Sequence, residues 1–135
     1  MEQQKIVLVT GAGSGIGKAS AIAFSAKGHS VVLAGRRRDR LEQVASVCSN
    51  ETLIVEADVA DPESVVYLFK TLKEQFARLD VLFNNAGGGS PPRQFEEIPF
   101  EEWQRVINVN LTGTFLCTQA AFGIMKEQTP MGGRI

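Results

Sequence analysis

The sequence predicts an α/β fold built around a parallel sheet that helices cover on both faces. Short apolar runs rich in β-branched residues recur along the chain, at 6–9, 31–34, 53–55 and 80–83. Each run is continuous rather than alternating, which is typical of strands buried on both faces of a parallel sheet. Segments with apolar residues at helical spacing separate these runs. Strands that alternate with helices in this way favour right-handed crossover connections.

Four helices are expected between and after the strands: about 15–27, a segment with an apolar stripe over 41–48, 61–76, and about 99–126. The third begins with an N-cap acid, a first-turn proline and a second acid, at Asp61, Pro62 and Glu63. The chain then breaks at 129–133, and 134–135 is expected to begin a fifth strand. Because no linker or repeat separates these elements, residues 1–135 are predicted to form a single domain.

Composition and charge exclude several classes of function. The chain has 135 residues and a net charge of −1, so its charge does not favour a nucleic-acid partner. No apolar run approaches the length of a membrane span, and the leader 1–5 passes directly into the first strand instead of forming a signal peptide. Cys48 and Cys117 lie far apart and outside any metal-ligand spacing, which indicates reduced core thiols. We expect a cytoplasmic protein without a metal site or a membrane partner.

A glycine-rich loop follows the first strand and opens the first helix. Glycines in such a loop let a phosphate approach backbone N–H groups at the positive end of a helix. Two familiar templates fail here. The triphosphate loop would need glycine at Ala12 and a hydroxyl at Ala19, and Gly-x-Gly-x-x-Gly would end on Ile16. The remaining pattern, Thr-Gly-x3-Gly-x-Gly, predicts nucleotide binding rather than a generic tight turn. The candidate residues are Gly11, Gly13, Ser14, Gly15, Ile16 and Gly17.

The end of the second strand indicates which nucleotide binds. An acid about twenty residues past the loop would accept hydrogen bonds from the ribose 2′-hydroxyl of NAD. This chain instead has Arg36, Arg37 and Arg38, and no acid before Asp39. A guanidinium pairs with a 2′-phosphate, whereas a carboxylate repels it. The sequence therefore favours NADP(H) over NAD(H), with Arg36 and Arg37 as the candidate contacts. The alternative is that these arginines form a solvated helix start.

Four motifs now stand in order along the chain: Thr10-Gly11-x3-Gly15-x-Gly17, Asp58-Val59, Asn84-Asn85-Ala86-Gly87 and Asn108-Val109-Asn110-Leu111-x-Gly113. On these motifs the chain resembles, over its whole length, the short-chain dehydrogenase/reductase family. The resemblance implies a doubly wound, Rossmann-like parallel sheet with four strands and the start of a fifth. It also implies hydride transfer between NAD(P)(H) and the alcohol or carbonyl group of a small-molecule substrate.

The resemblance further implies roles for individual residues. The pyrophosphate would lie along the loop, beside Gly11, Ser14, Gly15, Ile16 and Gly17. Arg36 matches the position typical of NADP-preferring members. Asp58 would accept a hydrogen bond from the adenine amino group, with the Val59 backbone beside it. The segment after the fourth strand would line the adenosine side and steady the sheet, through Asn85, Ala86 and Gly87.

Asn110 matches the family's catalytic asparagine, which holds a water in a proton relay. Asparagine is a poor helix-interior residue because its amide competes for backbone groups, so Asn108 and Asn110 in mid-helix are unusual by propensity. A local kink or a satisfied core amide is the alternative interpretation of these two residues.

The family's other catalytic residues, a Ser and a Tyr-x-x-x-Lys pair after the fifth strand, have no match. The single tyrosine, Tyr67, has Thr71 four positions later and falls in the third helix. We therefore expect these 135 residues to be the cofactor-binding half of an oxidoreductase, truncated before those residues and inactive alone. A non-catalytic dinucleotide-binding or regulatory protein is the alternative.

The last helix is apolar on more than one side. Its large apolar residues cannot all face one sheet: Trp103, Val106, Ile107, Leu111, Phe115, Leu116, Ala120, Phe122 and Ile124. Leaving several of them bare would cost on the order of 1.5–3 kcal/mol each. In the family this helix also packs against a partner subunit, so the resemblance implies a homo-oligomer formed through 99–127. Without its continuation, the fourth strand would be left at the edge of the sheet.

Overall fold

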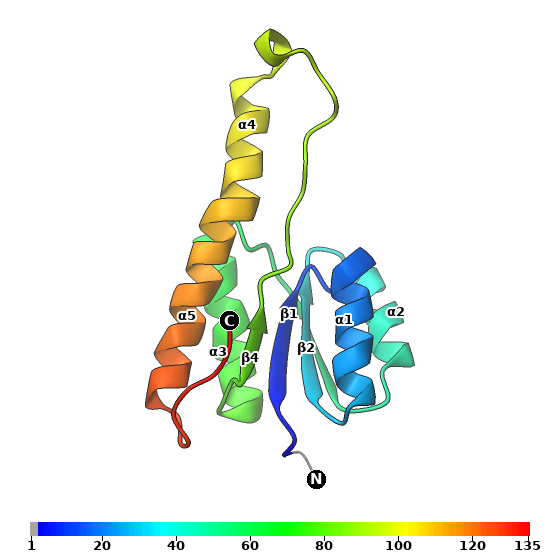
Figure 1. Ribbon diagram of the computed structural model, residues 1–135, viewed down its shortest axis with the longest axis vertical. Coiled ribbons are helices and arrows are strands. Elements are labelled where there is room, and N and C mark those ends of the chain that lie inside the picture. The colour runs from blue at the N-terminus through cyan, green and yellow to red at the C-terminus, as the bar shows by residue number, and fades with distance from the viewer. Residues whose placement is uncertain (1–2) are drawn as a thin grey trace.

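Four parallel strands form one sheet at the centre of the computed structural model, which describes residues 3–135 (Figure 1). Met1 and Glu2 of the expected leader lie outside the described residues. The strands are β1 (Ile6–Thr10), β2 (Ser30–Gly35), β3 (Thr52–Glu56) and β4 (Val81–Phe83). Their order is β3-β2-β1-β4, and every pairing is parallel. The chain therefore winds outward from β1 in one direction, then crosses back to place β4 on the other side.

Helices cover both faces of the sheet, which confirms the predicted doubly wound architecture. Helices α1 (Gly15–Ala26) and α2 (Arg38–Val47) pack on one face, and α3 (Pro62–Phe76) and α5 (Gly113–Glu127) on the other. Val7 and Val9 of β1 belong to the core beneath α1 and α2, and Leu8 belongs to the opposite core. The strands thus bury both faces, as their continuous apolar runs predict.

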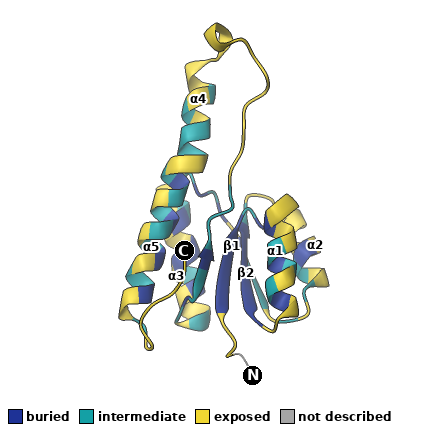
Figure 2. Ribbon diagram, in the orientation of Figure 1, coloured by how far each residue is buried: buried dark blue, intermediate teal, exposed yellow. Residues whose placement is uncertain are grey.

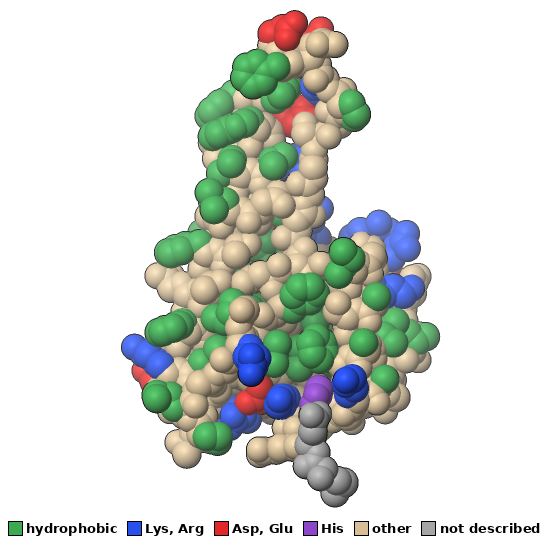
Figure 3. All heavy atoms as spheres, viewed as in Figure 1, with side chains coloured by type: hydrophobic (Ala, Val, Ile, Leu, Met, Phe, Trp, Pro, Cys, Tyr) green, Lys and Arg blue, Asp and Glu red, His purple; other side chains and the backbone are tan. Residues whose placement is uncertain are grey.

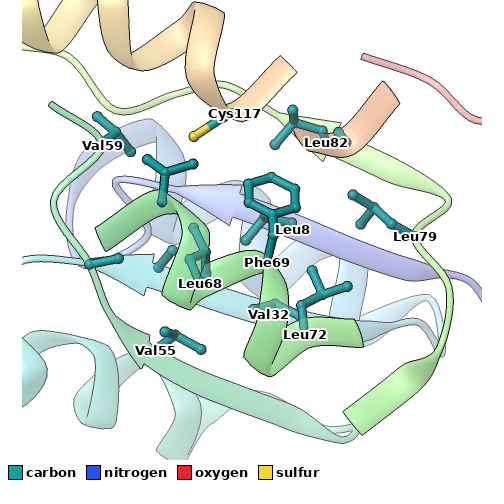
Figure 4. Packing of buried hydrophobic residues seen from close by; sticks show 14 of the residues in the cluster. Leu8, Val32, Val55, Val59, Leu68, Phe69, Leu72, Leu79, Leu82 and Cys117 are labelled. Atoms are coloured by element: carbon teal, nitrogen blue, oxygen red, sulfur yellow. The ribbon is translucent and has the colours of Figure 1, made fainter. Parts of the chain in front are cut away.

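The core beneath α3 and α5 is assembled from elements far apart in the sequence (Figure 4). Leu68 and Leu72 of α3 have no exposed surface, and Cys117 of α5 is also fully buried. Burial raises the pKa of the Cys117 thiol to about 11, so this cysteine stays protonated and unreactive near neutral pH. This agrees with the expectation of a core thiol.

An elongated arm projects beyond the sheet (Figures 1 and 2). It consists of the loop after β4, a short 3-10 helix (Phe95–Glu97) and helix α4 (Phe100–Ile107). The loop is tied along α4, because Arg93 donates to the Glu102 carboxylate at 3.0 Å and Arg105 donates to the Gly89 carbonyl at 2.9 Å. No residue of α4 is buried, so these polar contacts hold the arm together where no apolar core does.

The single long helix predicted over 99–126 is interrupted. Helices α4 and α5 are joined by a π-turn (Asn108–Thr112). Two side chains there donate hydrogen bonds to backbone carbonyl oxygens. The Asn110 amide donates to the Val106 carbonyl at 2.9 Å, and the Thr114 hydroxyl donates to the Asn110 carbonyl at 2.9 Å. Such side-chain bonds compete with the regular helical ladder, and π-turns frequently mark functional sites.

The chain returns to the sheet beside β4. Arg134 forms a parallel bridge with Val81 and bonds on both sides of it, to Asp80 and Leu82, at 2.9 Å each. The expected start of a fifth strand is therefore present as a single bridge, and it covers part of the edge that β4 was expected to expose. Among residues 3–135, no helix is long and apolar enough to cross a bilayer.

Asp80 anchors the amino-terminal ends of β1 and β4. Its carboxylate accepts a hydrogen bond from the Ile6 backbone at 2.9 Å and is held by the Arg78 guanidinium at 2.7 Å. Burial alone would raise the pKa of Asp80, but the hydrogen bonds from Arg78 and Ile6 outweigh it. The pKa of this carboxyl therefore lies below its ordinary value.

We expect Asp80→Asn to lower the free energy of unfolding at neutral pH by about 1.5–3 kcal/mol, because two charge-assisted hydrogen bonds are weakened. A carboxyl with a lowered folded-state pKa stabilises the fold above its unfolded pKa of about 4, and this is lost as pH falls through the folded-state value. The variant should therefore lose less stability on acidification. Urea unfolding at neutral and acid pH measures both effects.

Glu74→Gln is the matched control, because Glu74 is exposed and its one ion pair within residues 3–135 is with Lys70, at 3.9 Å. Its unfolding free energy should change by less than about 0.5 kcal/mol. An acid dependence in Asp80→Asn as steep as in the parent protein would contradict this account.

Candidate functional site

A cavity of about 500 Å³ lies where the carboxyl ends of all four strands meet. It is centred on the point where the winding reverses, between β1 and β4, which is where open α/β sheets bind ligands. Nearly all the candidate binding residues line it: Gly11, Gly13, Ser14, Gly15, Ile16, Arg36, Arg37, Asp58, Val59, Asn85, Ala86 and Gly87. Gly17 and Asn110 do not line this cavity.

The glycine loop presents bare amides to the cavity. Gly11 and Gly15 have left-handed φ values of +62° and +53°, which side chains disfavour. Among residues 3–135, the backbone N–H groups of Gly13, Ser14 and Gly15 have no hydrogen-bond acceptor. Helix α1 also has no side-chain cap and no acid in its first turn. Its positive end is therefore uncompensated and suited to an anion.

Gly17 lies behind the loop rather than at the cavity wall. A Cβ at this position would stand 2.2 Å from the Gly11 carbonyl oxygen and 2.4 Å from the Asn85 amide nitrogen. Gly17 is thus needed for close packing of α1 against the loop. This differs from the expected place of Gly17 beside the pyrophosphate.

Thr10 connects the carboxyl ends of β1 and β4. Its buried hydroxyl oxygen accepts hydrogen bonds from the backbone N–H groups of Asn85, at 3.0 Å, and Ala86, at 2.9 Å. In return the Asn85 side chain donates to the carbonyls of Thr10, at 3.1 Å, and Gly11, at 3.2 Å. We call this set of bonds the Thr10–Asn85 clamp. It fixes two walls of the cavity relative to each other.

Asp58 follows β3 and is held in a tight turn. Its Oδ1 accepts from the Ala60 backbone at 2.9 Å, and its own N–H donates to the Ser64 hydroxyl at 2.8 Å. The other carboxylate oxygen has no hydrogen bond within residues 3–135. Asp58 can therefore offer an acceptor to a ligand in the cavity that it lines.

The π-turn closes the cavity beside Asp58. A Cβ on Gly113 would stand 2.6 Å from the Val59 side chain, so this glycine lets α5 begin directly against the strand-end loop. The close approach places Val109 in the cavity wall. Val109 was not among the predicted site residues, although it stands within the motif that contains Asn110.

Asn110 binds the loop after β4 instead of facing the cavity. Its amide donates to the Gly88 carbonyl at 2.8 Å, and its Oδ1 accepts from the Gly88 N–H at 3.3 Å. A Cβ on Gly87 would stand 2.7 Å from the same oxygen. Asn110 thus orients the segment 87–88, which adjoins the cavity through Gly87.

Four arginines stand at or near the start of α2, and they differ in their partners. Arg37 pairs with Asp39 at 3.7 Å, and Arg38 pairs with Glu42 at 3.2 Å. Within the described chain, Arg36 and Arg40 have no ion pair, and both line the cavity. Sequence reasoning missed Arg40, which stands in the first turn of α2 and lies in none of the four motifs. A ligand with a pyrophosphate, an adenine and a further phosphate fits these donors and acceptors.

The single tyrosine does not line this cavity. Tyr67 is 59% exposed on α3, away from the residues that line the cavity. No group of three or more potential metal ligands occurs within residues 3–135. Neither finding alters the candidate site.

Residues 5–135 match the model of a protein family described as short chain dehydrogenase. A 3-oxoacyl-[acyl-carrier-protein] reductase of Synechocystis is 42% identical over an alignment of 135 residues, which covers 97% of this chain and 53% of that protein. An uncharacterised oxidoreductase of Staphylococcus aureus is 40% identical over 126 residues, 93% of this chain and 54% of that protein. The chain thus spans about half the length of the curated relatives it matches.

Two solved structures with the same fold are complexes with nicotinamide nucleotides. A 3-ketoacyl-(acyl-carrier-protein) reductase from Brucella melitensis, complexed with NADH, superimposes with a TM-score of 0.87 at 35% identity, over 91% of this chain and 50% of that chain. An alcohol dehydrogenase from Thermococcus sibiricus, complexed with 5-hydroxy-NADP, also has a TM-score of 0.87, at 34% identity, over 92% of this chain and 54% of that chain.

The Thr10–Asn85 clamp leads to a prediction about one hydroxyl. Thr10→Val keeps the side-chain shape but removes the acceptor of the Ala86 N–H, and it leaves the Asn85 N–H with only the Phe83 carbonyl, at 2.9 Å. We expect the free energy of unfolding to fall by about 1–3 kcal/mol. Amide hydrogen exchange should become faster at Ala86, and less so at Asn85, whose N–H keeps the Phe83 carbonyl as an acceptor.

Thr10→Ser is the control, because it retains the hydroxyl and removes one methyl group. It should preserve the slow exchange of both amides and lose less stability than Thr10→Val. If both variants exchanged these amides at the parent rate, the clamp would not be what holds β4 to the loop.

Proposed function

Because the chain belongs to the short-chain dehydrogenase family, we propose that its protein is an NADP(H)-preferring oxidoreductase. It would transfer hydride between the nicotinamide cofactor and the alcohol or carbonyl group of a small molecule. One observation carries the cofactor part of this proposal. The cavity combines bare loop amides with Arg36 and Arg40, two arginines without carboxylate partners in the described chain. This arrangement suits a dinucleotide that bears an additional phosphate.

Different residues of the cavity would bind different parts of the cofactor. The bare amides of Gly13, Ser14 and Gly15 would hold the pyrophosphate at the end of α1. The free oxygen of Asp58 would accept from the adenine amino group, and Arg36 would pair with the 2′-phosphate. A bound nicotinamide cofactor supplies the hydride or accepts it.

Asn110 would act beside the reacting groups, as its match to the family's catalytic asparagine implies. Both ends of its amide are engaged with Gly88, at 2.8 and 3.3 Å, so the side chain has one defined orientation. An ordered water placed by such a group can relay a proton. We propose that Asn110 contributes this positioning and that 135 residues alone support binding without turnover.

Turnover tests the enzyme directly. In the protein at its natural length, we expect carbonyl-dependent loss of NADPH absorbance with at least one member of a panel of ketones and aldehydes. The value of kcat/KM should be higher with NADPH than with NADH, because only NADPH carries the 2′-phosphate. The 135-residue chain should bind NADPH in a fluorescence titration and show no turnover.

Each outcome separates the alternatives. Binding without turnover at natural length would favour a non-catalytic dinucleotide-binding or regulatory protein. A higher kcat/KM with NADH would contradict the assignment to NADP(H). Turnover by the 135-residue chain would contradict the division into binding and catalytic parts.

The apolar side of the long helix supports a second proposal, that the protein is a homo-oligomer joined through 99–127. Trp103, Leu111, Phe115 and Phe122 are between 53% and 65% exposed along this helix. Figure 3 shows apolar side chains gathered on the face of the arm. Exposed apolar groups that cluster in this way mark protein interfaces, and a second copy of the same helix would cover them.

A charge on this face should disrupt the oligomer. We expect Phe115→Asp to shift the protein to monomer in light scattering coupled to gel filtration. Tyr67→Asp is a matched control, because Tyr67 and Phe115 are each 59% exposed but lie on different helices. The control should keep the parent mass. A monomeric parent protein, or an unchanged mass in Phe115→Asp, would contradict the proposed interface.

A further inference from the structure

We infer that Arg40 is a second cation for the 2′-phosphate, acting with Arg36, and that it determines cofactor preference. This inference rests on the proposed NADP(H) function and extends it to a residue that the four sequence motifs do not contain. Three observations support it: the position of Arg40 in the cavity wall, its packing on the glycine loop, and its lack of a carboxylate partner within residues 3–135.

The position of Arg40 follows from the geometry of α2. Arg40 stands in the first turn, where its backbone N–H donates to the Arg37 carbonyl at 3.1 Å. Its side chain lines the same cavity as Arg36, Ser14 and Asp58. Arg36 and Arg40 therefore line one cavity from the end of β2 and from the helix that follows.

Gly13 allows this helix to approach the loop. A Cβ on Gly13 would stand only 3.0 Å from the Arg40 Cβ. A side chain at position 13 would require the Arg40 side chain to give way by a few tenths of an ångström. The stem of Arg40 consequently lies against the loop whose amides face the cavity.

The charges around Arg40 also favour an anionic ligand. Arg37 and Arg38 have carboxylate partners, at 3.7 and 3.2 Å, whereas Arg36 and Arg40 have none within residues 3–135. A cation in the first turn of a helix is disfavoured by the helix dipole. A phosphomonoester carries nearly two negative charges at neutral pH, so one guanidinium leaves it only partly neutralised. Arg40 supplies the second.

The pyrophosphate is a competing target, because Arg40 packs close to the loop. That phosphate group already has the bare amides of Gly13, Ser14 and Gly15 available to it. The two targets also differ in a measurable way. Loss of a pyrophosphate contact weakens NADH and NADPH equally, whereas loss of a 2′-phosphate contact weakens NADPH alone.

The test compares Arg40→Gln with Arg38→Gln in the protein at its natural length. Both changes remove one positive charge from α2, but Arg38 does not line the cavity. For Arg40→Gln we expect the Kd for NADPH to rise about ten-fold or more and the Kd for NADH to change less than about two-fold. Arg38→Gln should leave both values within about two-fold.

Further variants keep the result interpretable. Arg40→Lys retains a charge without the bidentate geometry and should recover part of the NADPH affinity. Parent-like NADPH binding by Arg40→Gln would overturn the inference while leaving the proposed function standing. An equal loss for NADH and NADPH would also overturn it. A parent protein that binds neither NADPH nor the isolated 2′,5′-ADP moiety would overturn the proposed function itself, and the inference with it.

Discussion

The site depends on the clamp between Thr10 and Asn85. The two residues stand 75 positions apart in the sequence and at the carboxyl ends of the two strands that flank the reversal point. The Thr10 hydroxyl is the acceptor of the Ala86 N–H and a second acceptor of the Asn85 N–H, which also donates to the Phe83 carbonyl. A half-buried N–H that loses its acceptor costs more than an ordinary hydrogen bond contributes. Strand pairing alone brings β1 and β4 together over three residues. The clamp extends that contact into the loops, where the cavity begins.

Much of the fold follows from pattern alone. Continuous apolar runs identify strands buried on both faces, and the alternation with helices implies parallel pairing. The acid, proline and acid at Asp61, Pro62 and Glu63 correctly mark the start of α3, where the Asp61 side chain accepts from the Glu63 N–H at 3.1 Å. These features succeed because each depends on local spacing and on which residues avoid water. The order of the strands is also constrained, because right-handed crossovers leave few topologies.

The remaining features depend on contacts between distant residues. The π-turn replaces a regular helix because Asn110 and Thr114 bond to nearby carbonyls, and helical periodicity does not report which carbonyl a side chain will use. Gly17 shares a motif with the cavity glycines, yet it packs behind them, and only the position of the Gly11 carbonyl reveals this. Arg40 looks like any charged residue on an exposed helix until the loop beneath it is placed. Polar residues within sequence motifs could therefore be identified from the sequence. Residues that reach the cavity only because helices pack against loops could not.

The order β3-β2-β1-β4 has a consequence for how the molecule responds to its own ligand. The walls of the cavity come from five separate stretches of chain, and they stand together only when β4 has docked against β1. A ligand that contacts all of these stretches therefore holds them together across the sheet. The unfolded chain has no equivalent binding site. By mass action, a ligand at 100 times its Kd stabilises such a fold by about 2.7 kcal/mol. The concentration of such a ligand would then influence how long the folded protein survives.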